Sequence, residues 1–352
     1  MSEKSRDMPG EIAREIERWF RVNARDLPWR PDPVDGHRDP YRALVSELML
    51  QQTQVSRVVE KYVSFLQRFP SVEALAAAPE TDVLAEWSGL GYYRRARLLH
   101  AAAKSIVEDH AGVFPTEPNQ MLSLPGVGRY TAGAIASIVL GQREAILDGN
   151  VERVLLRLHA RTDPPKDKVT QDWAWAKAQA LVDASDQPGM LNEGLMELGA
   201  TVCTPSAPKC PACPVRAMCA SHERGLVEEI PTPKPRAKQK NWFTVCFLVR
   251  DSAGRLLIET RPASGLWAGM VQPPSAEGER AIGAAQAATL AGVEAGGHLG
   301  RFTHITTHRK VSFEVYSGTI ADGLGSRQWV TLDDLQGLAL SNAHRRVFAM
   351  AV

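Results

Sequence analysis

Four of the five cysteines in this 352-residue chain lie within about 17 residues, and this cluster limits what the chain can fold into. They are Cys203, Cys210, Cys213 and Cys219, separated by six, two and five residues. A disulfide framework would spread its cysteines along the chain and would need an oxidising compartment. A dense group of four instead predicts a metal site. The spacing leaves a 4Fe-4S cluster and a structural zinc ion both open, because each accepts four thiolates.

The composition excludes several classes of protein. Hydrophobic residues make up 44% of the chain and charged residues 23%, which is typical of a globular protein and not of a disordered one. The 41 Lys and Arg side chains nearly balance the 40 Asp and Glu side chains, so bulk charge does not indicate a nucleic-acid partner. The N-terminal residues are charged and lack the apolar core of a secretory signal. A cytoplasmic location is therefore expected.

The hydrophobic periodicity changes once along the chain. Apolar residues recur at helical spacing through 41–69, 94–109, 130–140, 151–161 and 191–202, whereas 241–250, 255–260 and 311–320 are strand-like. A hairpin turn is expected at 251–254 and a helix at 281–291. The proline- and cation-rich residues 227–240 are typical of an extended linker. We therefore predict a multidomain chain, with an all-helical domain over 1–226 and an α+β domain over 241–352.

A glycine-rich segment, LPGVGRYTA at 124–132, precedes one of the predicted helices. Gly126, Val127 and Gly128 would form a tight hairpin that leaves backbone amides free at a helix N-terminus. Such amides bind a phosphate without needing net positive charge. A plain helix–helix turn is the alternative interpretation.

Two carboxylates stand out from their surroundings. Glu47 interrupts the apolar run 43–50, so it should be partly buried; burial raises a carboxyl pKa and suits a general acid. A buried salt-bridge partner is the alternative for Glu47. Asp148 lies where a loop enters a helix, about 20 residues after the hairpin opens. It could serve only as a helix N-cap, or it could be a carboxylate held near the hairpin.

These motifs occur in one order, and together they carry a resemblance. The segments SELMLQQTQ (46–54), GLGYYR (89–94), LPGVGRYTA (124–132) and LDGNVER (147–153), followed by the cysteines, resemble the helix–hairpin–helix, endonuclease III-like DNA glycosylases with a 4Fe-4S cluster. Within that superfamily the chain is similar to the adenine DNA glycosylase (MutY) family. The resemblance implies one 4Fe-4S cluster on the loop 203–219 and a Nudix-like 8-oxoguanine recognition domain over 241–352.

The resemblance also implies a reaction. A monomeric base-excision repair enzyme would remove adenine mispaired with 8-oxoguanine or guanine in duplex DNA, by hydrolysis of the N-glycosidic bond. Glu47 would protonate ring nitrogen 7 of the adenine, and Asp148 would stabilise the cationic sugar left behind. Tyr130 and Asn150 would orient the carboxylates and the water. The endonuclease III branch has a nucleophilic lysine where this chain has Tyr130, so a monofunctional enzyme without strong strand cleavage is expected.

Further residues match positions that contact the substrate in the family. Those lining the adenine pocket are Arg25, Leu27, Trp29, Arg30 and Glu193, those wedged into the duplex are Gln52 and Tyr92, and those on the loop that reads 8-oxoguanine are Thr303 and His304. A hydrolytic Nudix enzyme needs closely spaced glutamates to hold Mg²⁺, and alanines occupy much of 281–291. The C-terminal domain should therefore bind and not hydrolyse.

Two alternative functions are compatible with the same motifs. One is an endonuclease III-like glycosylase that removes a pyrimidine or acts on another mismatch, although Tyr130 and the C-terminal domain count against it. The other is a DNA-binding redox module without catalysis, in which Glu47 and Asp148 would be structural. Measuring adenine release in a Glu47→Gln variant separates these cases.

Overall fold

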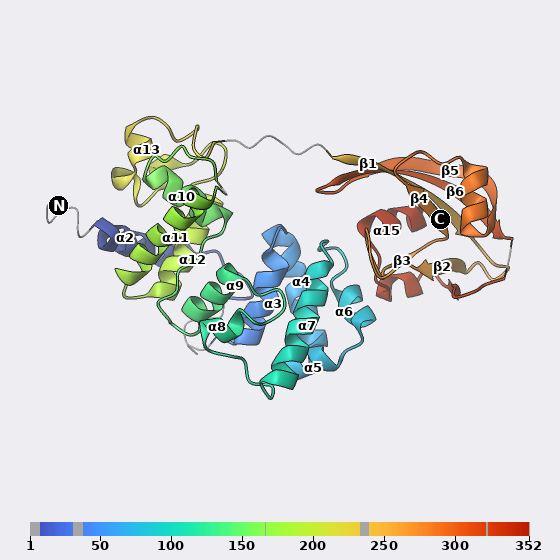
Figure 1. Cartoon of the computed structure of the whole chain (residues 1–352), viewed down its shortest axis with the longest axis horizontal. Coiled ribbons are helices and arrows are strands. Elements are labelled where there is room, and N and C mark those ends of the chain that lie inside the picture. The colour runs from blue at the N-terminus through green and yellow to red at the C-terminus, as the bar shows by residue number, and fades with distance from the viewer. Residues whose placement is uncertain (1–7, 31–37, 166, 233–238, 322, 352) are drawn as a thin grey trace. The chain divides into compact units, whose positions relative to one another are not determined.

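The structure is a computed structural model that describes residues 8–30, 38–165, 167–232, 239–321 and 323–351 (Figure 1). The chain forms two compact units. The first comprises residues 1–52, 69–76 and 101–235, and the second comprises residues 53–68, 77–100 and 236–352. Two helical segments from the first hundred residues therefore belong to the same compact unit as the C-terminal β-strands.

The N-terminal two thirds of the described chain are helical, as the periodicity predicted. Asp39 begins α3 as an N-cap, since its carboxylate accepts a hydrogen bond from the backbone N–H of Tyr41 at 2.8 Å. The predicted helix at 94–109 is α7, with the same bounds. The helices are α2 (Met8–Asn23), α3 (Pro40–Leu50), α4 (Val55–Arg68), α5 (Val72–Ala77), α6 (Glu80–Glu86), α7 (Arg94–Asp109), α8 (Pro118–Met121), α9 (Arg129–Ala134), α10 (Gly149–Leu158), α11 (Lys168–Asp183), α12 (Pro188–Thr201) and α13 (Ala220–Glu223).

One predicted helix is irregular. The segment expected as a single helix at 130–140 is α9 followed directly by a π-helix, η1 (Ile135–Val139). A hydrogen bond from the Ser137 hydroxyl to the Gly133 carbonyl, at 2.7 Å, accompanies the change. A π-turn widens the helix locally, and such turns are frequent at functional sites.

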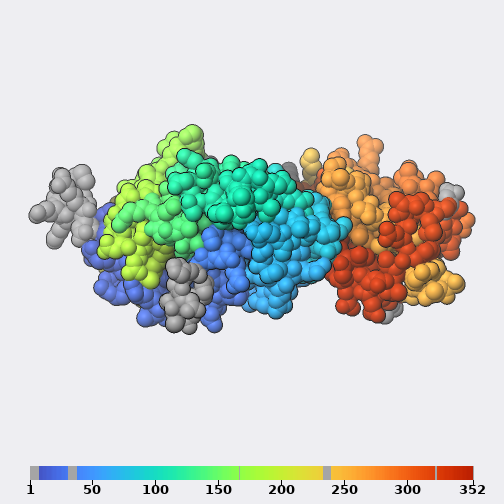
Figure 2. Space-filling model, turned by 90° about the horizontal axis from the view of Figure 1, so that it is seen from below, coloured from blue at the N-terminus to red at the C-terminus, as the bar shows by residue number. Residues whose placement is uncertain are grey.

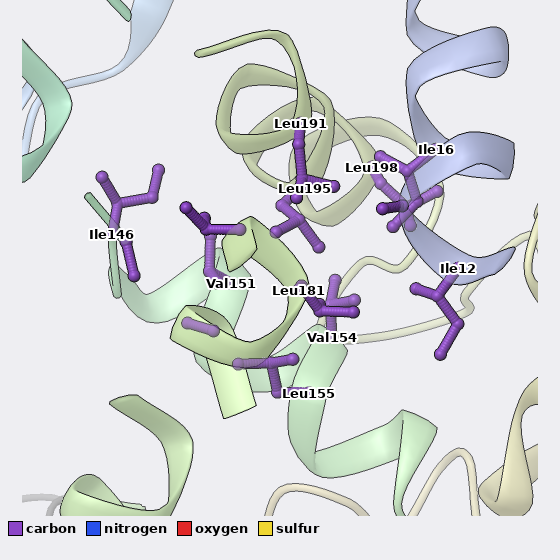
Figure 3. Packing of buried hydrophobic residues seen from close by; sticks show 14 of the residues in the cluster. Ile12, Ile16, Ile146, Val151, Val154, Leu155, Leu181, Leu191, Leu195 and Leu198 are labelled. Carbon is purple, nitrogen blue, oxygen red and sulfur yellow. The ribbon is translucent and has the colours of Figure 1, made fainter. Parts of the chain in front are cut away.

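The core of the first unit lies where α2, α10, α11 and α12 meet (Figure 3). Ile16 from α2, Leu155 from α10 and Leu195 from α12 are fully buried in it. In the space-filling view the blue atoms of α2 and the yellow-green atoms of α11 and α12 form one continuous surface (Figure 2). Gly194 allows the close approach of α12 to α2, because a Cβ there would lie 2.7 Å from Ile16 Cγ2.

The C-terminal residues form two small sheets. Four strands pair in the order β4-β1-β6-β5, and three pair in the order β3-β2-β7. Helix α14 packs against β4 and β5. The elements are β1 (Lys240–Val249), β2 (Leu256–Thr260), β3 (Val271–Gln272), β4 (Ser275–Gly278), α14 (Ala284–Ala291), β5 (Val293–Ile305), β6 (Arg309–Ile320), β7 (Gln328–Val330) and α15 (Asn342–Phe348).

Two details differ from the sequence predictions. The turn at 251–254 is present, but β1 and β2 join different sheets and share only one bridge, Arg250 to Leu256. The Asp251 carboxylate bonds the amides of Ala253 and Arg255 and so closes the turn on itself. The segment 302–304, expected as a loop, lies within β5, where Phe302 pairs with Phe313. This long strand is difficult to predict from the sequence, because the glycines within 293–301 are unfavourable in strands.

Specific contacts join the two parts of the second unit. The hydroxyls of Ser88 and Tyr93 both donate to the carbonyl of Leu340, at 2.9 and 3.0 Å. The Arg345 guanidinium in turn donates to the Ser88 hydroxyl at 2.9 Å. These buried hydrogen bonds explain why residues 77–100 belong to this unit. The described helices include none with the length and apolar character needed to cross a bilayer.

Candidate active site

Glu47, near the C-terminal end of α3, is surrounded by acidic and phenolic groups. The pKa of Glu47 is raised to about 7: burial is the main cause, a hydrogen bond with Tyr130 opposes the rise, and the charges of Asp148 and Glu193 add to it. The structure therefore brings together residues that lie about 100 positions apart in the chain. At neutral pH this carboxyl is poised between its protonated and ionised forms, which is the property a general acid needs.

The Tyr130 phenol interacts with both Glu47 and Met196. Burial raises the pKa of the Tyr130 phenol well above its ordinary range, and the charges of Glu47 and Asp148 add to the effect. The phenol is therefore neutral and has a single proton to donate. Its oxygen also lies 3.2 Å from the Met196 sulfur, a weak acceptor. When Glu47 is ionised, Tyr130 can donate to the carboxylate; when Glu47 is protonated, Tyr130 can accept from it and donate to sulfur.

Asp148 is the N-cap of α10 and is also part of the acidic pair, so the two interpretations of this residue coexist. One carboxylate oxygen accepts from the amides of Asn150 (2.9 Å) and Val151 (2.7 Å), and the other accepts from the Asn150 side chain at 2.9 Å. Burial raises the pKa of Asp148, while these donors and the Arg153 charge lower it. Asp148 has three donors, so it holds negative charge more readily than Glu47.

Arg153 and Gly199 hold Asn150 in place. The Arg153 guanidinium donates to Asn150 Oδ1 at 2.9 Å, to the Gly199 carbonyl at 2.8 Å and to the Cys203 carbonyl at 2.7 Å. A Cβ on Gly199 would lie 2.6 Å from Asn150 Cβ, so only glycine lets α12 approach this closely. Arg153 and Gly199 are not among the site residues that the sequence predicts.

The residues predicted to line a base pocket gather around α12. Glu193 accepts from Arg30 Nε at 3.0 Å and forms an ion pair with Arg38 at 2.8 Å. Glu197, one turn later, accepts from Arg25 and Arg30. Leu27 is buried and Trp29 is partly buried in the same loop. Sequence reasoning missed Glu197 and Arg38; the four-residue spacing of Glu193 and Glu197 was the available signal.

The glycine hairpin has the geometry that its sequence predicts. Gly126 has φ +80°, in the left-handed region where glycine carries no steric cost. Gly128 is extended and forms the N-cap of α9, with no side chain covering the first amides. Val127 is buried and anchors the turn. The helix begins one residue before Tyr130, so the hairpin leads directly into the helix that carries this tyrosine.

Both predicted wedge residues have left-handed backbones. Gln52 has φ +55° and Tyr92 has φ +48°, conformations that cost a non-glycine residue about 1–2 kcal/mol. Gln52 is exposed, and Tyr92 is 44% exposed. The guanidinium of the buried Arg95 lies 5.6 Å from the Tyr92 ring centre and donates to the Gly91 carbonyl at 3.1 Å. Strain retained at an exposed aromatic side chain is typical of a functional position.

Thr303 and His304 lie in β5, close to the turn that leads to β6. Phe302 stacks on Phe313 with ring centres 4.7 Å apart, so it belongs to the core. Thr303 points to the other face and is exposed, whereas His304 packs beside Trp267 with ring centres 5.7 Å apart. Burial lowers the pKa of His304, and the Arg346 charge lowers it further. The Tyr92 hydroxyl hydrogen-bonds the Thr307 hydroxyl, in the turn after β5.

The four clustered cysteines line one small cavity, together with Arg157 and Pro208. Several N–H groups are directed at their sulfur atoms: the amide of Val215 at Cys213, those of Ser221 and His222 at Cys219, and Arg157 Nη1 at Cys203, 3.4 Å away. Donors of this kind stabilise metal-bound thiolates. In the part of the chain described, no three His, Cys, Asp or Glu side chains have the arrangement of a single-ion site. Cys246, the fifth cysteine, is separate from this group and buried in the C-terminal domain.

Comparison with known proteins identifies the family. A family model for the HhH-GPD superfamily of base excision DNA repair proteins matches residues 45–178, and a NUDIX domain model matches residues 245–350. An adenine DNA glycosylase of Homo sapiens is 35% identical over 94% of this chain and 72% of its own length. This chain belongs to the adenine DNA glycosylase family. A further family member, from Mycobacterium tuberculosis, is 42% identical over 56% of this chain and 63% of its own length.

Solved structures agree with the helical fold. A thermostable thymine-DNA glycosylase has a TM-score of 0.56 at 26% identity, covering 63% of this chain and all of that one. A non-covalent complex of endonuclease III with DNA has a TM-score of 0.51 at 20% identity, covering 64% of this chain and 99% of that one. The predicted architecture, a helix–hairpin–helix glycosylase fold followed by a Nudix-like domain, is confirmed for this member of the adenine DNA glycosylase family.

Proposed function

We propose that this chain removes adenine mispaired with 8-oxoguanine or guanine in duplex DNA, by hydrolysis of the N-glycosidic bond. The observation that carries the proposal is the pairing of Glu47, whose pKa is raised to about 7, with Asp148 across Tyr130. Glu47 is still partly protonated at neutral pH, while Asp148 has three donors that favour its charge. This asymmetry supports Glu47 as the acid and Asp148 as the group that stabilises the cation.

The adenine must first leave the base stack, at a cost of a few kcal/mol. Gln52 and Tyr92 would occupy the space beside 8-oxoguanine, and the amides at Gly126, Val127 and Gly128 would hold a backbone phosphate. Arg25, Leu27, Trp29, Arg30 and Glu193 would surround the extruded base. Partial exposure of Glu47 and Asp148 is consistent with access for a base.

Glu47 would then protonate adenine at ring nitrogen 7, which turns the base into a better leaving group. General acid catalysis of this kind contributes about 10²–10⁴-fold to a rate. The glycosidic bond breaks, its electron pair goes to the protonated base, and the sugar becomes an oxocarbenium-like cation. Asp148 stabilises that cation until water adds, with Asn150 and Tyr130 holding the carboxylates in position.

The cysteine loop would hold one 4Fe-4S cluster. Cys203, Cys210, Cys213 and Cys219 line one cavity and receive N–H donors at sulfur, which fits four thiolate ligands. The cluster would supply structural rigidity to the loop behind Arg153 and Arg157. Purified protein should be yellow-brown with absorbance near 400 nm; a colourless protein with stoichiometric zinc would contradict this assignment.

The C-terminal strands would read the oxidised guanine. Thr303 is the exposed residue of the 302–304 segment, with the half-buried His304 beside it. We expect Thr303→Val and His304→Ala to reduce discrimination between 8-oxoguanine and guanine more than they slow the chemistry. Point substitutions are preferable to deleting residues 241–352, because residues 77–100 pack with that region.

The deciding experiment is single-turnover base release from duplexes that carry adenine opposite 8-oxoguanine, guanine or thymine. The proposal requires fastest release opposite 8-oxoguanine, and Glu47→Gln should abolish release while DNA binding remains. Release of a pyrimidine in place of adenine would support the endonuclease III-like alternative. Binding without release in the intact protein would support a non-catalytic module.

Borohydride should trap little Schiff base, since Tyr130 replaces the lysine nucleophile. We propose that the enzyme acts on DNA as a monomer. Its location would be a bacterial-type cytoplasm, in association with the nucleoid.

A further inference from the structure

Glu197 is a buried carboxylate that contacts two residues of the proposed adenine pocket, Arg25 and Arg30, but has no role in the mechanism above. The Glu197 side chain has no solvent exposure. It accepts from Arg25 Nε at 2.5 Å and Nη2 at 3.0 Å, and from Arg30 Nη2 at 3.0 Å. These charge-assisted bonds lower the pKa of Glu197, against the effect of burial. Glu197 is therefore ionised and shared between two guanidinium groups.

Arg30 connects this carboxylate to the active site. Its Nε donates to Glu193 at 3.0 Å, its Nη2 donates to Glu197 at 3.0 Å, and its Nη1 donates to the Arg25 carbonyl at 3.2 Å. One guanidinium thus bridges two glutamates on successive turns of α12. The Glu193 charge in turn acts on Glu47. Direct contacts therefore run from Glu197 through Arg30 to Glu193, and the charge of Glu193 extends this series to Glu47.

The charges of this cluster nearly balance. Arg25, Arg30 and Arg38 carry three positive charges, while Glu193 and Glu197 carry two negative charges. The Arg38 guanidinium reaches only Glu193 among the described residues, with Nη2 at 2.8 Å. Removing the Glu197 charge would break the ion pair of Arg25 and would leave Arg30 paired with Glu193. Removing one charged partner from a buried ion cluster destabilises a protein by more than the intact cluster stabilises it, because the remaining charge is left buried without compensation.

We propose that Glu197 is a positioning residue for base excision: it fixes Arg25 and Arg30 around the adenine pocket and, through Arg30, sets how much negative charge Glu193 presents to Glu47. This inference rests on the proposed function. It assigns Glu197 no contact with the substrate. Its effect on the reaction passes through the arginines, which distinguishes it from a residue that only stabilises the fold.

The proposal predicts a change in the pH dependence of the chemistry. The groups that face Glu47 are Tyr130 on α9, Asp148 before α10 and Glu193 on α12. In Glu197→Gln, Arg30 would neutralise Glu193 more completely. The apparent pKa of Glu47 would then fall by at most about one unit, because the charge of Glu193 is the smallest of the causes that raise it. Single-turnover excision would become up to about ninefold slower at pH 8 but would change less than about twofold at pH 5.5, where Glu47 is mostly protonated in both proteins.

Two further variants make the sign of the effect decisive. Arg25→Gln frees Glu197 to draw Arg30 away from Glu193, so its pH–rate profile should shift toward higher pH, opposite to Glu197→Gln. Glu197→Asp keeps the charge and should restore the wild-type profile, though with slower excision. A matched control is Glu17→Gln: Glu17 is also buried, but it accepts from the Ser185 hydroxyl and touches no arginine of the cluster.

The experiment is single-turnover release of adenine opposite 8-oxoguanine from pH 5.5 to 8.5, with the melting temperature measured for each variant. Opposite shifts for Glu197→Gln and Arg25→Gln, with none for Glu17→Gln, support the proposal. An unshifted profile in Glu197→Gln overturns it, even if the rate falls. If Glu197→Gln does not fold, an unshifted profile in Arg25→Gln, whose side chain is 39% exposed, overturns it instead. An inactive wild-type protein would refute the proposed function, and the variants would then not be needed.

Discussion

Glu47 should lower the stability of the protein at the pH where it works. Its pKa in the folded protein is about 7, against 4.5 for the same group in water. A carboxyl with a raised folded-state pKa binds more protons in the folded state than in the unfolded state between these values. Stability is therefore lost as the pH rises through this window. Replacing Glu47 with Gln, which cannot ionise, should remove this loss.

The size of the effect follows from the two pKa values. A difference from 4.5 to about 7 corresponds to about 3 kcal/mol at pH 8, since one unit is about 1.4 kcal/mol. At pH 5 the same comparison gives less than about 1 kcal/mol, because Glu47 is then mostly protonated in the folded protein. For a unit of this size, about 3 kcal/mol raises the melting temperature by about 6–12 °C.

The assay is a thermal melt of the wild-type protein and Glu47→Gln at pH 5 and pH 8, without DNA. We expect the variant to melt higher than the wild type at pH 8 and close to it at pH 5, while base release is lost at both. Gln preserves the shape of the side chain and can still accept from Tyr130, so packing should not change. Equal melting temperatures of the two proteins at both pH values would refute the argument that Glu47 is held protonated by its surroundings.

Three further substitutions test other parts of the site. Asp148→Asn should leave the melting temperature nearly unchanged, because Asn caps helices as well as Asp, but should slow single-turnover release about 10²-fold or more; a rate near wild type would remove Asp148 from the mechanism. Gly199→Ala places a Cβ 2.6 Å from Asn150 Cβ, so it should cost about 1–3 kcal/mol in a denaturant melt and slow release, whereas Gly149→Ala, with no atom within 4 Å of the new Cβ, should not destabilise the helix. Gln52→Gly relieves a left-handed backbone, so it should keep or raise the unfolding free energy by up to about 1 kcal/mol while slowing excision; a clear drop in stability would show that the side chain is structural.

Much of the helical region could be predicted from the sequence because its signals are local. The periodicity over 94–109 gave the bounds of α7, and Asp148 was recognised as a residue that begins a helix. The spacing of Cys203, Cys210, Cys213 and Cys219 predicted a shared metal site, and the structure collects them around one cavity. Each of these signals depends on residues within a few turns or one loop.

The strand prediction was weaker for a physical reason. A strand becomes visible when its residues alternate between buried and exposed faces, and the Gly-rich start of β5 has almost no buried side chains to alternate. The expectation of a loop at 302–304 came from the family resemblance, but pairing with β6 makes this segment part of a strand. The turn at 251–254 was recognised, but whether its flanking strands pair depends on the sheets beyond them.

The sequence by itself determined which residues could carry the chemistry: an acidic side chain in an apolar helix, a second one at a helix start, and a tyrosine where a relative has lysine. Only the tertiary structure decided what those residues do to one another. Desolvation and Coulomb interactions depend on the arrangement in space, so the raised pKa of Glu47 comes mainly from the burial that folding creates, with a further contribution from the charges of Asp148 and Glu193, which lie far away in the chain. For the same reason Glu197 could not be recognised as part of this cluster until α12 had brought it beside Arg25 and Arg30.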